Sequence, residues 1–200
     1  MHGVIYIQMR ISGGTAKGRV TAKKHLFSKG LNSPGLRPTS SKVREALFDI
    51  LRGRLDGSVF ADIYAGTGTV GLEALSRGAG TVLFVEWRQF LINIIRDSAE
   101  KLGCDERIML IKEPAEEFFG KSLRRKQKID IFFIDPPYHS DEIDKVLPVV
   151  AQGHMLKKEG IVVVEHFFKK KLPGKVVNLE VQKHYRYGDT GLTLYTKAEI

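Results

Sequence analysis

The segment Asp135-Pro136-Pro137-Tyr138 combines residue types that can act on an amino group. It follows the apolar run "IDIFFI" at 129–134, which predicts a buried strand ending at Asp135. The exocyclic amine of a base is a poor nucleophile because its lone pair is delocalised into the ring. The Asp135 carboxylate and the Pro136 carbonyl can accept its two N–H bonds, and the second proline stiffens the turn. Tyr138 offers a flat ring for stacking a flipped-out base, a contact worth about 1–3 kcal/mol. We predict that these four residues are catalytic in base-amine methylation; the alternative is a plain turn after a buried strand.

A second segment, "DIYAGTGTVG" at 62–71, predicts a cofactor site. Gly66, Gly68 and Gly71 match the dinucleotide fingerprint G-x-G-x-x-G. Asp62, however, lies at the strand tip, where an anion would repel a pyrophosphate and attract a cation. S-adenosylmethionine carries an ammonium and a sulfonium and no phosphate, and glycines let the backbone approach it without Cβ clashes. The sequence therefore favours S-adenosylmethionine, and the predicted contacts in this segment are Asp62, Ala65, Gly66, Thr67 and Gly68.

The adenosine half of such a cofactor has candidates on the next two strands. Glu86 ends the strand "TVLFVE", 20 residues after Gly66, where a carboxylate can accept both ribose hydroxyls. Trp87 follows and can lie against the adenine, whose edge we expect near Pro114 and Ala115. Two alternatives stay open: Glu86 as a solvent-facing strand end, and Trp87 as an ordinary packing residue.

These residues must be positioned by an α/β fold. Strand-like runs at 58–64, 81–86, 107–111, 129–134 and 160–166 alternate with helix-like runs at 69–78, 88–103, 114–120 and 140–152. Such repeats predict a mostly parallel sheet with helices on both faces. The final runs, 175–187 and 192–197 around "GDTG", predict an antiparallel hairpin and bring the expected count to seven strands.

Local signals set some of the expected helix ends. Ser40 or Ser41 can cap a helix whose apolar face holds Val43, Leu47, Ile50 and Leu51. We expect helices to stop at Gly78 and Gly103, and the helix over 140–152 to be interrupted near Pro148.

Charge is concentrated at the start of the chain. The net charge of the 200 residues is +9; residues 1–58 hold eleven Lys and Arg against three Asp and Glu, whereas the rest hold 21 against 20. The chain fits one domain, with a basic N-terminal extension over 1–36 and the catalytic domain over 37–200. A basic segment beside a near-neutral domain favours a polyanion partner, although it can also be a solvated face.

Other features narrow the class of protein. No run of 18 apolar residues predicts a membrane span, and "MHGVIYIQ" lacks the basic n-region and cleavage site of a signal peptide. A single cysteine, Cys104, gives no disulfide and fits a cytoplasmic protein. It follows a predicted helix, away from the strand tips, so a cysteine adduct is not expected. The six histidines lack metal-ligand spacing, so we expect no metal.

Several motifs together resemble a known family. "MRISGGTAKGR", "RPTSSKVREALFDIL", "DIYAGTGTVGLEALSRGA", "FVE", "FIDPPY" and "YGDTGL" are similar to the bacterial 16S ribosomal RNA guanine-N2 methyltransferases that modify guanine 966, from Met9 to about Tyr195. The resemblance implies a Rossmann-like class I methyltransferase fold with a small N-terminal β-hairpin. It implies a cytoplasmic monomer that acts on 16S rRNA or an assembly intermediate of the small subunit. It also implies RNA contacts at Arg10, Lys17, Arg19, Arg37 and Thr39.

Three other readings stay open at this point. A DNA adenine-N6 or cytosine-N4 methyltransferase would share the Asp-Pro-Pro-Tyr segment but usually has a target-recognition region. A nucleotide-binding redox domain would explain the glycines but not Asp62. A catalytically silent RNA-binding assembly factor would not need the intact segment at 135–138.

Overall fold

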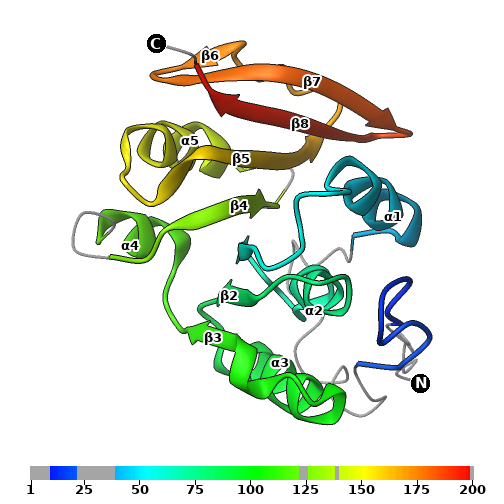
Figure 1. The fold of residues 1–200 in the computed structure, drawn as a ribbon. Coiled ribbons are helices and arrows are strands. Elements are labelled where there is room, and N and C mark those ends of the chain that lie inside the picture. Colours follow the sequence, from blue (N-terminus) through cyan, green and yellow to red (C-terminus); the bar gives the residue numbers. More distant parts are fainter. Residues whose placement is uncertain (1–9, 22–38, 122–125, 138–139, 199–200) are drawn as a thin grey trace, which may run out of the picture.

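One sheet runs through the molecule (Figure 1), and the structure, a computed structural model, describes residues 10–21, 39–121, 126–137 and 140–198. Its strand order is β3-β2-β1-β4-β5-β8-β7-β6. Five strands are parallel and three are antiparallel. The parallel strands are β1 (Val59–Ile63), β2 (Thr81–Val85), β3 (Ile108–Ile111), β4 (Ile129–Ile134) and β5 (Leu156–Phe167). The antiparallel ones are β6 (Lys175–Val176), β7 (Leu179–Tyr187) and β8 (Thr190–Lys197). The predicted α/β class and C-terminal hairpin are confirmed.

The described sheet has eight strands where the sequence predicted seven, because the run at 175–187 is two strands. The short β6 folds back and pairs with β7, with Lys175 opposite Glu180 and Val176 opposite Leu179. Between them Val177 has φ 54°. A β-branched residue is uncommon at positive φ, and no glycine or proline marks this turn, so the run at 175–187 was predicted as one strand.

Helices cover both faces of the sheet, as predicted. The helices α1 (Ser41–Ile50), α2 (Thr69–Ser76) and α3 (Gln89–Leu102) share one apolar cluster with one face of the strands. The helices α4 (Ala115–Gly120) and α5 (Glu142–Gln152) share a second cluster with the other face. Neighbouring strand residues divide between the clusters, as the period of a strand requires: Phe60 belongs to the first and Ala61 to the second.

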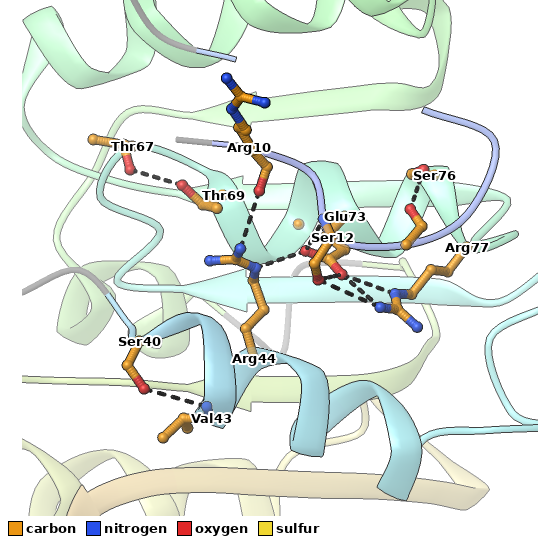
Figure 2. A network of polar contacts seen from close by, with 12 residues as sticks. Arg10, Ser12, Ser40, Val43, Arg44, Thr67, Thr69, Glu73, Ser76 and Arg77 are labelled. Carbon is orange, nitrogen blue, oxygen red and sulfur yellow. Dashed lines mark hydrogen bonds and ion pairs between the residues drawn. The ribbon is translucent and has the colours of Figure 1, made fainter. Parts of the chain in front are cut away.

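The predicted helix ends hold in part. Ser40 caps α1, since its Oγ accepts a hydrogen bond from the Val43 backbone N–H at 3.2 Å (Figure 2). Gly103 ends α3 in the left-handed conformation. The predicted interruption at Pro148 is wrong, because α5 continues through it. A proline inside a helix removes one backbone donor, and buried side chains on both sides, such as Leu147 and Val150, hold α5 on the sheet.

The described part of the N-terminal extension, residues 10–21, packs on α1 and α2. It forms a turn closed by an antiparallel bridge between Arg10 and Val20, in keeping with the expected hairpin. Ile11 is 1% exposed and lies in the same apolar cluster as α1 and α2. Residues 1–9 and 22–36, and the expected domain boundary at 36/37, lie outside the described residues. Within the described part of the chain, no helix has both the length and the apolar character to cross a membrane.

Candidate active site at the strand tips

The two predicted acids lie at the ends of adjacent strands. β1 pairs with β4 in parallel, with Ile63 opposite Ile134, and the Asp135 N–H points to the Ile63 carbonyl at 3.4 Å. The first and fourth strands along the chain are therefore neighbours in the sheet. Asp62 is close enough for its charge to raise the pKa of Asp135. Ligands bind outside the carboxyl ends of strands in open α/β sheets, so this is the expected place for a site.

Asp62 is a buried carboxyl group rather than an exposed anion. It is 2% exposed, and its Oδ2 accepts a hydrogen bond from the Gly71 N–H at 2.9 Å. Burial raises the pKa of Asp62 to about 8; the bond from Gly71 opposes this rise and the charge of Glu86 adds to it. The carboxyl therefore holds a proton for part of the time near neutral pH. A cation placed beside it would lower this pKa and restore the negative charge.

Two of the predicted glycines are required for packing inside the protein. A Cβ at Gly71 would lie 2.3 Å from Phe84 Cε1, and one at Gly68 would lie 2.7 Å from Ile95 Cγ1. Gly68 also has φ 74°, where side chains are strained. The missing side chains let α2 approach β2 and α3, and the expected approach of a ligand to the glycine loop stays a prediction.

Glu86 accepts hydrogen bonds from the glycine loop after β1 and from its neighbour Arg88. It is 3% exposed, which removes the alternative of a solvent-facing strand end. Its Oε2 accepts from the Gly66 N–H at 3.1 Å. The Arg88 side chain donates to both carboxylate oxygens, from Nε at 2.9 Å and Nη2 at 3.1 Å, and the Arg88 backbone donates at 2.9 Å. Sequence reasoning missed Arg88, although a cation two residues after a candidate ribose-binding acid is a visible signal.

The remaining cofactor candidates gather around the same loops. Trp87 is 61% exposed, with the Arg88 guanidinium 5.7 Å from its ring centre, so it is not a core packing residue. Pro114 precedes α4 and Ala115 begins it. The Glu86 N–H donates to the carbonyl of Ile111, the last residue of β3. Pro114 and Ala115 therefore follow a strand end that lies beside Glu86. Two further contacts order the glycine loop, from the Ala65 N–H to the Val85 carbonyl and between the Thr67 and Thr69 hydroxyls.

Asp135 lies among other carboxyl groups and is half-buried. Burial and the charge of Glu165 raise the pKa of Asp135 well above its usual range; the hydrogen bond from Thr39 opposes the rise and the charge of Asp62 adds to it. Thr39 Oγ1 donates to Asp135 Oδ2 at 3.2 Å, so this predicted RNA contact also touches the candidate catalytic acid. Sequence reasoning missed Glu165, which is 3% exposed at the end of β5. Pro136 is buried and Pro137 exposed.

Tyr64, which the sequence did not single out, connects the end of β1 to the start of α5. It follows β1 with φ 65°, unusual for a residue with a side chain. Its hydroxyl donates to Glu142 at the start of α5 at 2.6 Å. Burial, followed by the bond to Glu142, raises the pKa of this tyrosine. Strained backbone of this kind is found at functional sites. Tyr138 itself lies outside the described residues.

The N-terminal segment is held to the domain by Ser12 and by the Arg10 carbonyl, while its charged side chains are exposed. Arg44 Nε donates to the buried Glu73 carboxylate at 2.6 Å, and Arg77 Nη2 donates to it at 2.7 Å. Ser12 also donates to Glu73, and Arg44 donates to the Arg10 carbonyl at 3.0 Å (Figure 2). The predicted RNA-contacting side chains in this segment are all exposed: Arg10, Lys17 and Arg19. Arg37 lies outside the described residues.

The described residues contain no group of three or more His, Cys, Asp and Glu arranged to hold a metal ion. Cys104 is buried after α3, and burial raises the pKa of its thiol. It is not among the residues at the strand tips.

Comparison with known proteins gives matches over nearly the whole chain. The family described as "conserved hypothetical protein 95" matches residues 9–196. YlbH of Bacillus subtilis (strain 168) is 30% identical over 189 residues, which cover 94% of this chain and 99% of that protein. Ribosomal RNA small subunit methyltransferase D of Haemophilus influenzae is 31% identical over 159 residues, covering 79% and 78%. The solved structure of Escherichia coli yhhF has a TM-score of 0.78 at 26% identity, covering 96% of this chain and 99% of that chain.

Proposed function

The chain belongs to the conserved hypothetical protein 95 family, and we propose that it transfers a methyl group from S-adenosylmethionine to the N2 amine of a guanine in 16S rRNA. The named relative from Haemophilus influenzae is a small-subunit ribosomal RNA methyltransferase, which supports the rRNA substrate. The position corresponding to guanine 966 follows from the sequence resemblance. The observation that carries the proposal is the placement of Asp135-Pro136 at the tip of β4, beside Asp62 at the tip of β1.

The residues present fit S-adenosylmethionine better than a dinucleotide. The first turn of α2, where a phosphate would seek free N–H groups, has its Gly71 N–H already bound by Asp62. A cationic ligand would pair with the Asp62 carboxylate and lower its raised pKa, whereas a phosphate would find no favourable charge there. When bound, the cofactor supplies an electrophilic methyl group. We assign Asp62 to its cationic end, Glu86 to its ribose and Trp87 to its adenine.

Asp135 and its neighbours prepare the amine. The Asp135 carboxylate accepts one N–H of the amine and the Pro136 carbonyl accepts the other, which orients the nitrogen lone pair away from both. Thr39 holds one carboxylate oxygen of Asp135 in place. The raised pKa of Asp135 suits it to take the proton that the amine loses after methylation. Tyr138 is proposed to stack on the target base.

Single-stranded or unpaired RNA is the proposed form of the target. Side chains cannot read the deep major groove of an A-form helix, and an exocyclic amine inside a duplex is not accessible. The exposed cations of residues 10–21 are proposed to hold RNA phosphates near the site.

The test is incubation of the protein with a labelled methyl donor and small subunits or 16S rRNA from cells that lack the enzyme. Nucleoside analysis should yield N2-methylguanosine. Methyladenosine or methylcytosine in place of N2-methylguanosine, or no methylated nucleoside, would contradict the proposal.

A matched pair of variants tests the role of Asp135. Asp135→Asn keeps the shape but removes the carboxylate, and it should lower the single-turnover rate by about 100-fold or more while leaving cofactor affinity nearly unchanged. Asp97→Asn, at an exposed position on α3, is the control and should transfer methyl groups like wild type. If Asp135→Asn loses cofactor affinity instead, and transfer per bound cofactor survives, the assigned role is wrong.

A further inference from the structure

Two chain segments meet beyond the carboxyl end of β5. The loop after β5 begins at Phe168, and its N–H donates to the carbonyl of Asp189 in the turn between β7 and β8 at 2.8 Å. That turn has two residues, and Gly188 has φ 65°, which glycine allows without strain. The "YGDTG" motif therefore builds a tight turn that supports the loop. We call Phe168, Lys169, Lys171 and Arg186 the hairpin platform.

The centre of the hairpin platform is an arginine stacked on an exposed ring. The Arg186 guanidinium lies 4.2 Å from the centre of the Phe168 ring, and Phe168 is 38% exposed. Arg186 Nε donates to the Gly188 carbonyl at 3.0 Å, which fixes the plane of the guanidinium. Among the residues that the structure describes, none forms an ion pair with Arg186. An arginine held over an aromatic ring presents a charge beside a flat apolar surface.

The platform is attached to the chain that follows the catalytic segment. Lys170, within the same loop, donates to the Ser140 carbonyl at 3.3 Å and to the Asp144 carboxylate at 2.8 Å on α5. Ser140 lies five residues after Asp135. Lys169 and Lys171, on either side of Lys170, are exposed and have no ion-pair partner among the described residues.

We propose that the hairpin platform binds the single-stranded RNA next to the target nucleotide, with one unpaired base stacked on Phe168 and Arg186 and the flanking phosphates held by Lys169 and Lys171. This inference rests on the proposed function, and it places RNA on the antiparallel side of the catalytic segment as well as on the N-terminal segment. It also gives the hairpin turn a role that closing the sheet does not require.

The chemistry of the platform favours RNA over an acidic protein. Phosphates and bases alternate along a single strand, and the platform likewise presents cations beside a flat, exposed surface. A fixed turn lowers the entropy lost when a flexible strand is ordered on it. An acidic protein segment would use the charges but would gain little from the exposed face of Phe168.

The experiment measures the affinity of a fluorescent single-stranded RNA oligonucleotide, containing one guanine, by anisotropy over a range of salt concentrations. Phe168→Ala should weaken binding by about fivefold or more, the lower end for a base stacked on a ring, without changing the salt slope. Arg186→Ala should weaken binding and reduce the slope by about 1, whereas Arg186→Lys should keep the slope. Lys158→Ala, an exposed cation near the opposite end of β5, is the charge-matched control for Arg186→Ala.

Two further measurements separate the possible failures. Cofactor binding by calorimetry should be the same in all variants, because none of the changed residues lies at the cofactor site. An oligonucleotide of the same charge with abasic sites should bind wild type and Phe168→Ala equally. If Phe168→Ala and Arg186→Ala bind the RNA like wild type, or lose no more than Lys158→Ala, the platform is not an RNA surface. If wild type binds the RNA but methylates no guanine in 16S rRNA, the proposed function fails while the platform stands.

Discussion

Removing the Glu73 carboxylate should strongly destabilise the protein. Glu73 is fully buried in α2 and accepts hydrogen bonds from Arg44 of α1, from Arg77 just after α2 and from Ser12 of the N-terminal segment. Glu73→Ala would leave the Arg44 guanidinium, whose side chain is 10% exposed, without its carboxylate partner. Breaking one side of a buried ion pair costs about 3–5 kcal/mol. For a chain of this length, about 3 kcal/mol corresponds to a fall in Tm of roughly 6–12 °C.

Urea and thermal unfolding followed by circular dichroism measure this effect. A double-mutant cycle with Arg44→Ala should show a coupling free energy of about 1–3 kcal/mol, because the two side chains are in direct contact. The control is Asp49→Ala, which removes the exposed ion pair between Asp49 and Arg52 and should cost less than about 1 kcal/mol. If Glu73→Ala destabilises no more than this control, the network does not hold α1 and the N-terminal segment to α2.

The pH dependence gives an independent check. Burial alone would raise the pKa of Glu73, but the hydrogen bonds from Ser12 and Arg77 and the charge of Arg44 outweigh burial and lower it. A carboxylate whose folded-state pKa is depressed contributes stability above its unfolded pKa, and this stability is lost as the pH falls through the folded value. The stability difference between wild type and Glu73→Gln should therefore shrink in acid. A difference that stays constant from neutral pH to below the usual carboxyl range would refute the charge-based account.

Three other outcomes are expected. Gly71→Ala should lower stability by about 1–3 kcal/mol, measured by urea unfolding, because its Cβ would overlap Phe84; an unchanged midpoint would contradict this packing. Cofactor affinity, measured by calorimetry, should rise between pH 6 and 8 by up to about tenfold per pH unit, because Asp62 must lose a proton at a pKa of about 8 before a cation can pair with it. Asp62→Asn should flatten this pH profile. An equal profile in wild type and variant would show that Asp62 does not bind the cation. Replacing the three exposed cations Arg10, Lys17 and Arg19 together should lower the salt slope of RNA binding by up to about 2 and leave cofactor binding unchanged. An identical salt slope would show that these cations only face solvent.

The fold could be predicted because its signals are local and repeated. Apolar strands such as 129–134 are buried on both faces, so they read as continuous hydrophobic runs, and Gly103 marked a helix end through its left-handed conformation. The β6–β7 turn could not be predicted, because it uses Val177 at a positive φ where sequence patterns expect glycine or asparagine. The predicted interruption at Pro148 was wrong because tertiary packing keeps α5 continuous across this residue.

The proximity of the candidate site residues could be predicted from their positions along the strands, whereas their functional roles stay predictions. Asp62, Glu86 and Asp135 all end strands of one parallel sheet, so their proximity follows from topology. The sequence could not give their protonation, because burial and neighbouring carboxyl groups act only in the fold. It could not give Thr39 as the donor to Asp135 either, since 96 residues separate the two.

The Arg88 contacts to Glu86 have a consequence for cofactor affinity. Three donors from Arg88 and one from Gly66 already occupy the carboxylate. If Glu86 binds a ribose as proposed, the ribose hydroxyls would compete with the Arg88 guanidinium for the same carboxylate oxygens. If molecules in which Arg88 leaves these oxygens free form about a tenth of the population, the apparent Kd is about ten times weaker than the intrinsic one. On that proposal Arg88 would act as an internal competitor for the ribose, and removing its side chain would strengthen the apparent affinity.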